Sequence, residues 1–129
     1  MTITCLDLEG VLVPEIWIAF ADAVGIPELR RTTRDEPDYD KLMKFRLEIL
    51  RQHNLGLKEI QDTIKKIDPL PGAKKFLDEL RSCCQTIILS DTFEQFAAPL
   101  CFLFLDLLQM LLLHKHLLNA DHLLLLLFH

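Results

Sequence analysis

The spacing of the apolar residues changes several times along the chain, and each change predicts a new element. Residues 2–8 (TITCLDL) and 85–92 (QTIILSDT) are apolar and β-branched without a helical period, which is typical of short strands buried on both faces of a sheet. Apolar residues with helical spacing predict helices at residues 14–25, 38–54, 55–68, 72–84 and 93–100.

Proline, glycine and asparagine residues mark the ends of these expected helices. Pro14 suits the first turn of the first helix, Gly25 suits its C-cap, and Asn54 marks the end of the second helix. Residues 26–38 are polar and contain two prolines, so we expect a loop or short irregular turns there. The sequence PLPG at residues 69–72 predicts a break before the fourth helix.

The order of the elements predicts the fold class. It is strand, three helices, a break, a helix, a strand and a helix. Two buried strands that are joined through helices imply a parallel sheet with a right-handed crossover, and therefore an α/β fold. The helices between about residues 12 and 68 form an insert after the first strand, and this insert is large enough to make a small lid over the edge of the sheet.

Length, charge and cysteine content narrow the class of protein. A chain of 129 residues suits one domain with a real core. The formal net charge is −5 and the Lys and Arg residues are scattered, which argues against nucleic acid as the main partner. The four cysteines lack a zinc-binding spacing, and the N-terminus lacks the pattern of a secretory signal. We therefore expect a reduced protein of the cytoplasm.

The composition changes abruptly after Pro99. Fifteen of the 30 residues from Leu100 to His129 are Leu, and this stretch contains no Gly, Pro, Ser, Thr, Glu or Arg. A segment without turn-forming residues is not typical of an α/β domain. Polar residues between 106 and 116 interrupt it, so no apolar run is long enough to span a membrane, and we expect no membrane partner.

Both expected strands end in polar residues. Asp7 and Glu9 follow the first strand, and the sequence Ser-Asp-Thr at residues 90–92 ends the second. Because ligands of open α/β sheets bind at the carboxyl ends of the strands, we expect both carboxylates to line one cavity, with the Ser90 hydroxyl opposite. The plainer interpretation is that Asp7 and Glu9 are ordinary turn residues before Gly10.

These strand ends resemble two motifs of the haloacid dehalogenase superfamily of phosphotransferases. DLEGVLVPE at residues 7–15 is similar to its Asp-x-Asp-Gly-(Thr/Val) motif, and ILSDT at 88–92 is similar to its apolar strand that ends in Ser or Thr. Longer stretches at residues 5–21, 32–50 and 86–93 resemble bacterial phosphoserine phosphatases that also act as phosphoserine–homoserine phosphotransferases. The resemblance covers roughly the first 100 residues.

The resemblance also implies how the chain is divided. It implies a Rossmann-like, parallel-sheet core of the dehalogenase type at residues 1–11 and 69–129, with a helical cap at residues 12–68 inserted after the first strand. Two parts of the superfamily have no counterpart by residue 129: a downstream Lys that stabilises the phosphate, and an acidic loop of the GDxxND type. We therefore expect a truncated chain, the N-terminal part of a longer protein.

The two carboxylates take catalytic roles by resemblance. Asp7 matches the nucleophile that accepts the phosphoryl group as an aspartyl-phosphate. Glu9 matches the general acid/base, although most of the superfamily has Asp at this place. Asp7 and the backbone carbonyl of Glu9 also match the ligands of Mg²⁺, which is the implied cofactor.

Four further residues match positions that bind substrate. Ser90 and the backbone N–H of Asp91 match the phosphate-binding groups. Glu15 matches the residue that binds the ammonium group, and Arg46 the residue that binds the carboxylate. Other interpretations stay open, because Glu15 can favour a helix N-terminus, Arg46 can be a solvated helix charge, and Ser90 can be a helix N-cap.

The function implied by the resemblance is that of a Mg²⁺-dependent phosphoserine phosphatase. Its partners would be O-phosphoserine and, as a second phosphate acceptor, homoserine, and a homodimer is compatible with this function. The alternative is an inactive fragment or a non-catalytic interaction module of the same fold. Near the candidate site, we expect Cys5, Trp17 and Phe20 to be core residues.

Overall fold

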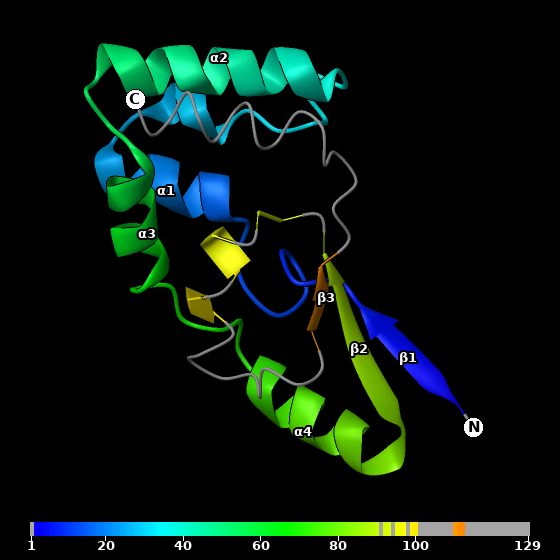
Figure 1. Cartoon of the computed structure of the whole chain (residues 1–129). Helices are drawn as coiled ribbons and strands as arrows, with labels where there is room; N and C mark the ends of the chain where they lie inside the picture. Colours follow the sequence, from blue (N-terminus) through cyan, green and yellow to red (C-terminus); the bar gives the residue numbers. More distant parts are fainter. Residues whose placement is uncertain (1, 91, 94, 98, 101–109, 113–129) are drawn as a thin grey trace.

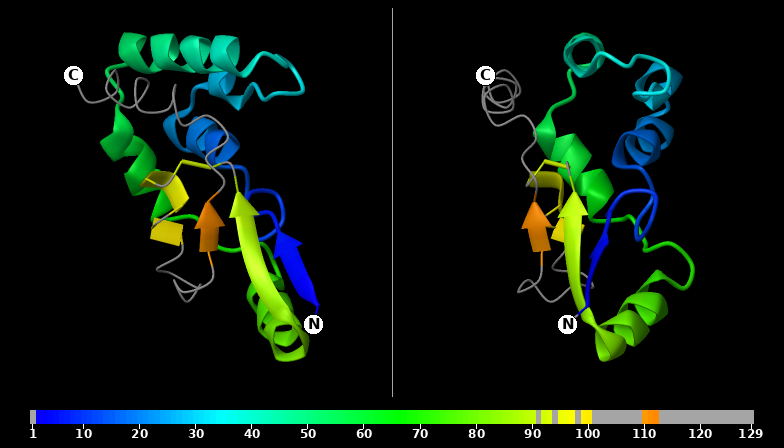
Figure 2. Two further views of the ribbon diagram at one scale, coloured as in Figure 1. Left: turned by 45° about the vertical axis from the view of Figure 1, so that its right-hand side comes forward. Right: turned by 90° about the vertical axis from the view of Figure 1, so that its right-hand side faces the viewer.

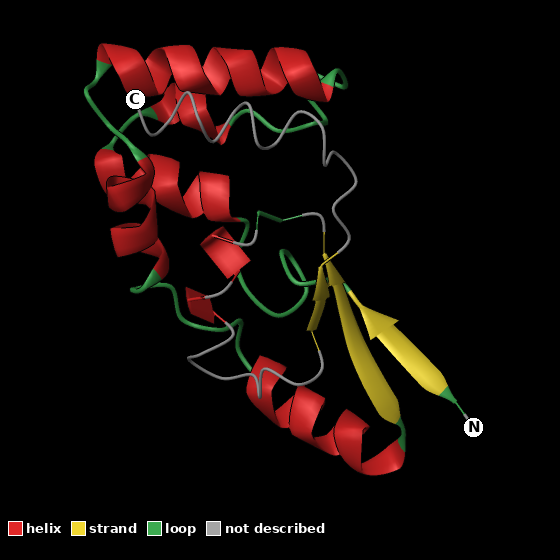
Figure 3. Ribbon diagram, viewed as in Figure 1, coloured by secondary structure: helices red, strands yellow, loops and turns green. Residues whose placement is uncertain are grey.

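The structure, a computed structural model, describes residues 2–90, 92–93, 95–97, 99–100 and 110–112 (Figure 1). Its elements in chain order are β1 (Ile3–Leu6), α1 (Ile16–Val24), the 3₁₀ helix η1 (Pro27–Arg30), α2 (Tyr39–Gln52), α3 (Leu57–Ile64), α4 (Ala73–Cys83), β2 (Gln85–Ser90) and β3 (Met110–Leu112). The helices and strands predicted before residue 93 are confirmed, with ends that differ by up to a few residues (Figure 3). Residues 95–97 and 99–100 are also helical.

The three strands form one parallel sheet in the order β1-β2-β3. Ile3 of β1 lies opposite Gln85 of β2, and Ile88 of β2 lies opposite Met110 of β3. The expected parallel α/β arrangement is therefore confirmed. β3 was not predicted from the sequence, and it adds a third strand from the Leu-rich stretch.

The helices lie at opposite ends of the sheet. Figures 1 and 2 show α1, η1, α2 and α3 beyond the carboxyl ends of the strands, and α4 near their amino ends. The segment between β1 and α4 therefore lies over the carboxyl ends of β1 and β2, where both strands are followed by polar residues. This is the side on which an open parallel sheet binds its ligands.

The main core lies between these helices and the strand ends. Phe20 of α1 and Ile60 and Ile64 of α3 are fully buried in one apolar cluster with Leu8, two residues after the end of β1. Phe96 and Leu100, from the helical residues after β2, belong to the same cluster. The insert and the strand ends are thus packed together, so residues on both can take fixed positions relative to one another.

α2 begins at a side-chain cap and carries one buried charge. The Asp38 side chain accepts a hydrogen bond from the backbone N–H of Lys41 at 3.2 Å, as an N-cap residue does. Apolar residues of α2 such as Leu42 and Leu50 are buried, and Arg46 lies on the same buried side of the helix. The interpretation of Arg46 as a solvated helix charge is therefore wrong.

The prediction that β1 is buried on both faces is wrong. Ile3 is 46% exposed and Cys5 is exposed, so Cys5 is not a core residue either. β1 stands at the edge of the described sheet, and only β2 pairs with it among the described strands. Ile3 and Cys5 point to the same face of the strand, because side chains alternate, and their exposure shows that this face is not fully covered, whereas Thr4 and Leu6 on the other face are half-buried.

Within the described ranges, none of the helices combines the length and the apolar character that crossing a bilayer requires.

Candidate active site

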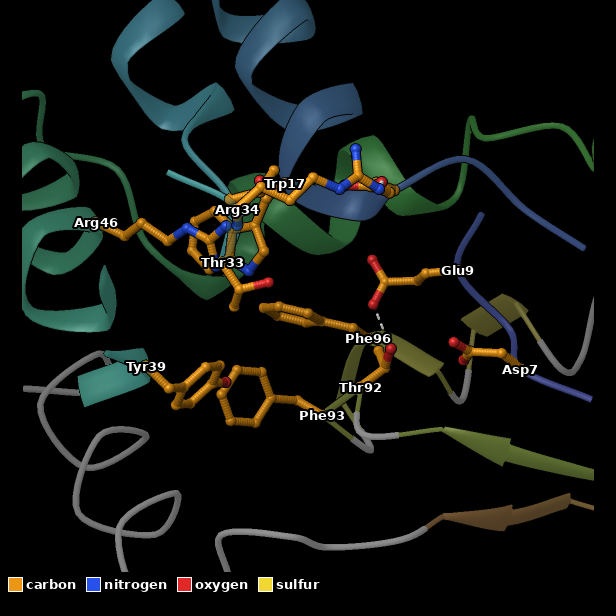
Figure 4. A pocket seen from close by; sticks show the side chains of 12 residues that line it. Asp7, Glu9, Trp17, Thr33, Arg34, Tyr39, Arg46, Thr92, Phe93 and Phe96 are labelled. Atoms are coloured by element: carbon orange, nitrogen blue, oxygen red, sulfur yellow. Dashed lines mark hydrogen bonds and ion pairs between the residues drawn. The ribbon is translucent and has the colours of Figure 1, made fainter. Parts of the chain in front are cut away.

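A cavity of about 300 Å³ opens beyond the carboxyl ends of β1 and β2 (Figure 4). It is lined by Asp7, Glu9, Glu15, Trp17, Thr32, Thr33, Arg34, Tyr39, Arg46, Thr92, Phe93 and Phe96. Four of the predicted site residues thus line one cavity: both carboxylates after β1, and both residues of the insert that were matched to substrate binding. Figure 4 shows the two carboxylates on one side of the cavity and Arg46 on the other.

The chain makes a tight turn after β1, and the core residue Leu8 lies between the two carboxylates in the sequence. Gly10 has a φ of 76°, and its N–H donates to the Val13 carbonyl at 2.7 Å, while the Val13 N–H donates to the Leu8 carbonyl at 3.1 Å. Leu8 points into the core and is fully buried. Because successive residues of an extended chain point to opposite sides, Asp7 and Glu9 face the cavity instead.

Both oxygens of the Glu9 carboxylate accept hydrogen bonds. Oε1 accepts the backbone N–H of Ile16 at 2.7 Å, and Oε2 accepts the hydroxyl of Thr92. Ile16 is the first residue of α1, so the negative charge lies at a helix N-terminus, where it is favoured. Asp7 Oδ1 accepts the backbone N–H of Leu8 at 2.7 Å, which restrains the Asp7 side chain.

Ser90 does not face the cavity as predicted. It is 3% exposed, and its Oγ donates to Thr92 Oγ1 at 2.9 Å and accepts the Thr92 N–H at 3.2 Å. Thr92, two residues further on, lines the cavity and carries the contact to Glu9. Ser90 therefore reaches the site only through Thr92. The predicted role of Asp91 lies outside the described residues.

Arg46 is buried at the far side of the cavity. Its side chain stacks on Trp17, with the guanidinium carbon 4.4 Å from the ring centroid, and its Nη2 donates to the Arg31 carbonyl at 2.8 Å. Nη1 contacts the Met43 sulfur at 3.6 Å, and the buried Nε has no hydrogen-bond partner among the residues that the structure describes. Trp17 is thus a wall of the cavity as well as a part of the helical packing.

The charge on Arg46 lies in a buried environment that disfavours it. Burial lowers the pKa of the Arg46 guanidinium to about 10, so it still carries its charge at neutral pH. Charge interactions with Tyr39, Glu9 and Glu15 act in the opposite direction and raise the pKa. A buried, charged guanidinium across a small cavity from two carboxylates favours ligands that carry both negative and positive groups.

Glu15 lies at the mouth of the cavity. It is the N-cap residue of α1, although its side chain makes no capping hydrogen bond. Its Oε1 lies 3.4 Å from Nη2 of Arg34, and the Glu15 side chain is 34% exposed while that of Arg34 is 83% exposed. Reasoning from the sequence missed Arg34, because an arginine in a polar loop carries no signal of its position.

The oxygen-rich strand ends are the place at which a metal would fit. Among the described residues, no group of three or more His, Cys, Asp and Glu side chains gathers in one place. Mg²⁺ prefers oxygen ligands, needs only one or two carboxylates and keeps several waters. Asp7 and the Glu9 backbone are compatible with such a site as a partial ligand set, since Asp7 is exposed beside the Glu9 turn.

Comparison with known proteins adds an independent line of support. Over 100 residues, 78% of this chain, the sequence is 61% identical to the protein named Phosphoserine phosphatase ThrH of Pseudomonas aeruginosa, and covers 49% of it. Over 98 residues, 76% of this chain, it is 62% identical to the Phosphoserine phosphatase of Pseudomonas syringae pv. tomato, and covers 41% of it. No protein-family model matches the chain.

These similarities confirm the resemblance that the motifs indicated. About three quarters of the chain is related to proteins named as phosphoserine phosphatases. The chain spans less than half the length of both of these relatives.

Proposed function

We propose that the cavity of this chain binds O-phosphoserine and that the chain removes its phosphate. About three quarters of the chain is related to proteins named as phosphoserine phosphatases. The observation that carries this proposal is the convergence of Asp7, Glu9, Glu15 and Arg46 on one cavity of about 300 Å³. A cavity of this size suits a small molecule, and these residues supply complementary charges for a phosphorylated amino acid.

The reaction would begin with Asp7 as the nucleophile. A carboxylate oxygen of Asp7 forms a bond to phosphorus, the bond from phosphorus to the serine oxygen breaks, and Glu9 supplies the proton for that oxygen. Water then attacks the aspartyl-phosphate, Glu9 takes the proton from the water, and the Asp7–phosphate bond breaks. Homoserine is proposed as a second acceptor, because its hydroxyl can attack in the place of water.

The hydrogen bonds around Glu9 support its proposed role as the base that takes the proton from water, because both carboxylate oxygens accept. To supply the proton to the serine oxygen, Glu9 would first have to be protonated, and one of these two contacts would have to be given up or reversed. The Ile16 N–H and the Thr92 hydroxyl hold the two carboxylate oxygens, so the group that moves the proton is fixed in orientation. Fixed orientation of an acid/base group keeps it within reach of the atoms between which the proton moves.

Mg²⁺ is the proposed cofactor. Asp7 and the Glu9 carbonyl would hold it, and when bound it would reduce the charge repulsion between the attacking carboxylate and the phosphate. Ser90 and the Asp91 N–H are proposed as phosphate-binding groups, although Ser90 is turned toward Thr92 here. Binding of phosphate by Ser90 would therefore require its hydroxyl to leave Thr92.

The division of the chain is also a proposal. Residues 12–68 would form a helical cap, and residues 1–11 and 69–129 the dehalogenase-type core. The position of α1, η1, α2 and α3 beyond the strand ends supports a cap that contributes substrate-binding residues (Figure 2). Among the described residues, Cys5, Cys83 and Cys84 are free thiols, which supports the cytoplasm as the proposed location.

Phosphate release from O-phosphoserine in the presence of Mg²⁺ tests the proposed function. We expect Asp7→Asn to reduce the rate by about 1,000-fold or more, as loss of a nucleophile does. Asp22→Asn is the matched control, because Asp22 is an exposed residue of α1 that pairs with Arg30 outside the cavity. Equal rates in the two variants, or no release by the unsubstituted folded chain, would contradict the proposal and favour the non-catalytic alternative.

A further inference from the structure

Thr92 lies where the ends of β1 and β2 meet at the cavity. It is buried, and its side chain lines the cavity beside Glu9 (Figure 4). The Thr92 hydroxyl donates to Glu9 Oε2 and accepts from Ser90 Oγ at 2.9 Å, while the Thr92 backbone N–H donates to the same Ser90 oxygen at 3.2 Å. Thr92 therefore connects Ser90 to Glu9.

The carboxylate of Glu9 sets the direction of these hydrogen bonds. An ionised carboxylate can only accept, so the single hydrogen of the Thr92 hydroxyl is directed at Glu9. The Thr92 oxygen is then an acceptor, and Ser90 supplies the hydrogen that it accepts. Successive hydrogen bonds of this kind polarise one another, so the contact with Glu9 strengthens the contact between Thr92 and Ser90.

The hydroxyl that Ser90 donates to Thr92 is the group proposed to bind phosphate. A hydroxyl carries one hydrogen, so Ser90 cannot donate fully to Thr92 and to a phosphate oxygen at the same time. Ser90 is also 3% exposed, so its hydroxyl has to turn away from Thr92 to reach a ligand in the cavity. Thr92 and phosphate thus compete for one donor.

We infer that Thr92 lowers the affinity of the site for phosphate by binding the Ser90 hydroxyl, and that phosphate binding separates the two hydroxyls. The inference rests on the proposed function and deepens it, because inorganic phosphate is the product of that reaction. Release of the product limits the rate of many enzymes, so a lower affinity for phosphate favours turnover. Thr92 is in this arrangement a positioning residue that acts through Ser90, and the observation behind it is the buried contact between their hydroxyls.

The experiment measures equilibrium binding of inorganic phosphate by the full chain, with and without Mg²⁺, by isothermal titration calorimetry. We expect Thr92→Val to bind phosphate about three- to tenfold more tightly, because the competing hydrogen bond is gone. Thr92→Ser keeps the hydroxyl and should bind phosphate as the unsubstituted chain does. Thr63→Val is the matched control, since the Thr63 hydroxyl donates to the Glu59 carbonyl at 3.1 Å within α3 and lies outside the cavity, and it should leave the affinity unchanged.

A second substitution tests whether Thr92 acts through Ser90. Ser90→Ala should weaken phosphate binding, and Thr92→Val should bring no gain when it is added to Ser90→Ala, because the donor for which Thr92 competes is absent. A merely structural role of Thr92 predicts weaker binding in Thr92→Val, the opposite sign. Circular dichroism verifies that each variant is folded, and Thr92→Ala, which also lacks the hydroxyl, should give the same gain as Thr92→Val.

Three results would overturn the inference. They are an unchanged or weaker phosphate affinity in the folded variants without the Thr92 hydroxyl, an equal gain in the Ser90→Ala background, and no phosphate binding by the unsubstituted chain. Because phosphate binding does not require turnover, a chain that shows the expected gain but releases no phosphate from O-phosphoserine would overturn the proposed function and leave this inference standing. A chain that turns over O-phosphoserine but shows no gain would do the reverse.

Discussion

The Thr92 hydroxyl joins the ends of two strands, because it donates to Glu9 after β1 and accepts from Ser90 at the end of β2. We expect Thr92→Val, which keeps the shape and removes the hydroxyl, to lower the free energy of unfolding by about 1–3 kcal/mol, the cost of leaving buried polar partners unsatisfied. Denaturant unfolding measures this. Thr92→Ser keeps the hydroxyl and should cost less, so an equal loss in both variants would contradict the role of the hydrogen bonds.

At the residue scale, the sequence predicted the site only in part. Asp7 and Glu9 could be placed at the cavity because both follow a strand of a parallel sheet, and ligands bind at the carboxyl ends of such strands. The same reasoning directed Ser90 to the cavity, where the structure has Thr92. The chain changes direction after β2 ends at Ser90, and alternation has no predictive value beyond that point. The position of Arg34 depends on a loop conformation that no local pattern predicts.

At the element scale, the capping of α2 gives a pH-dependent prediction. The hydrogen bond from the Lys41 N–H to Asp38 lowers the pKa of the Asp38 carboxyl below its ordinary value of 3.8. Because the pKa of Asp38 is lower in the folded state, its ionised form stabilises the fold at pH values above the ordinary pKa of 3.8. This stabilisation is lost as the pH falls through the lower pKa of the folded state. We expect Asp38→Ala to lower the melting temperature at pH 7.

The control for this effect is Asp38→Asn, which keeps a capping oxygen and removes the titrating group. Melting temperatures of both variants and of the unsubstituted chain at pH 7 and pH 3 measure the difference. The melting temperature of the Asn variant should lie closer to that of the unsubstituted chain at pH 3 than at pH 7. A gap that stays constant over this range would show that the charge of Asp38 does not contribute.

The elements themselves differed in how well the pattern predicted them. α2 was expected at residues 38–54 and lies at Tyr39–Gln52, because its apolar residues recur with helical spacing between a capping Asp and a terminal Asn. β3 lies within the Leu-rich stretch, whose composition shows no alternation and contains no Gly, Pro or Ser. The exposure of β1 depends on which strands and helices lie beside it, which its own sequence does not contain.

At the scale of the whole molecule, we expect copies of the chain to associate through the outer edge of β1. No described strand pairs with this edge, and Ile3 is 46% exposed. Exposed apolar strand edges favour pairing with other chains, and a charged side chain on the strand opposes it. We expect Ile3→Lys to raise the concentration at which the chain associates by about tenfold or more, measured by sedimentation velocity.

Phe76→Lys is the matched control for this prediction. Phe76 is 47% exposed, as Ile3 is, but it lies on α4 and not on a strand. If Phe76→Lys suppressed association and Ile3→Lys did not, the apolar surface of α4 would be the contact and the edge of β1 would not.

The pairing of Ile3 with Gln85 also has a consequence for the order of events during synthesis. β1 is made before β2, and roughly 80 residues separate the two strands, which takes on the order of ten seconds at ordinary rates of translation. α1 and α3 can already pack on one another in that interval, since both precede β2 in the chain. The two carboxylates would thus be made before β2, and the part of the cavity that Thr92, Phe93 and Phe96 line would form only after these residues emerge.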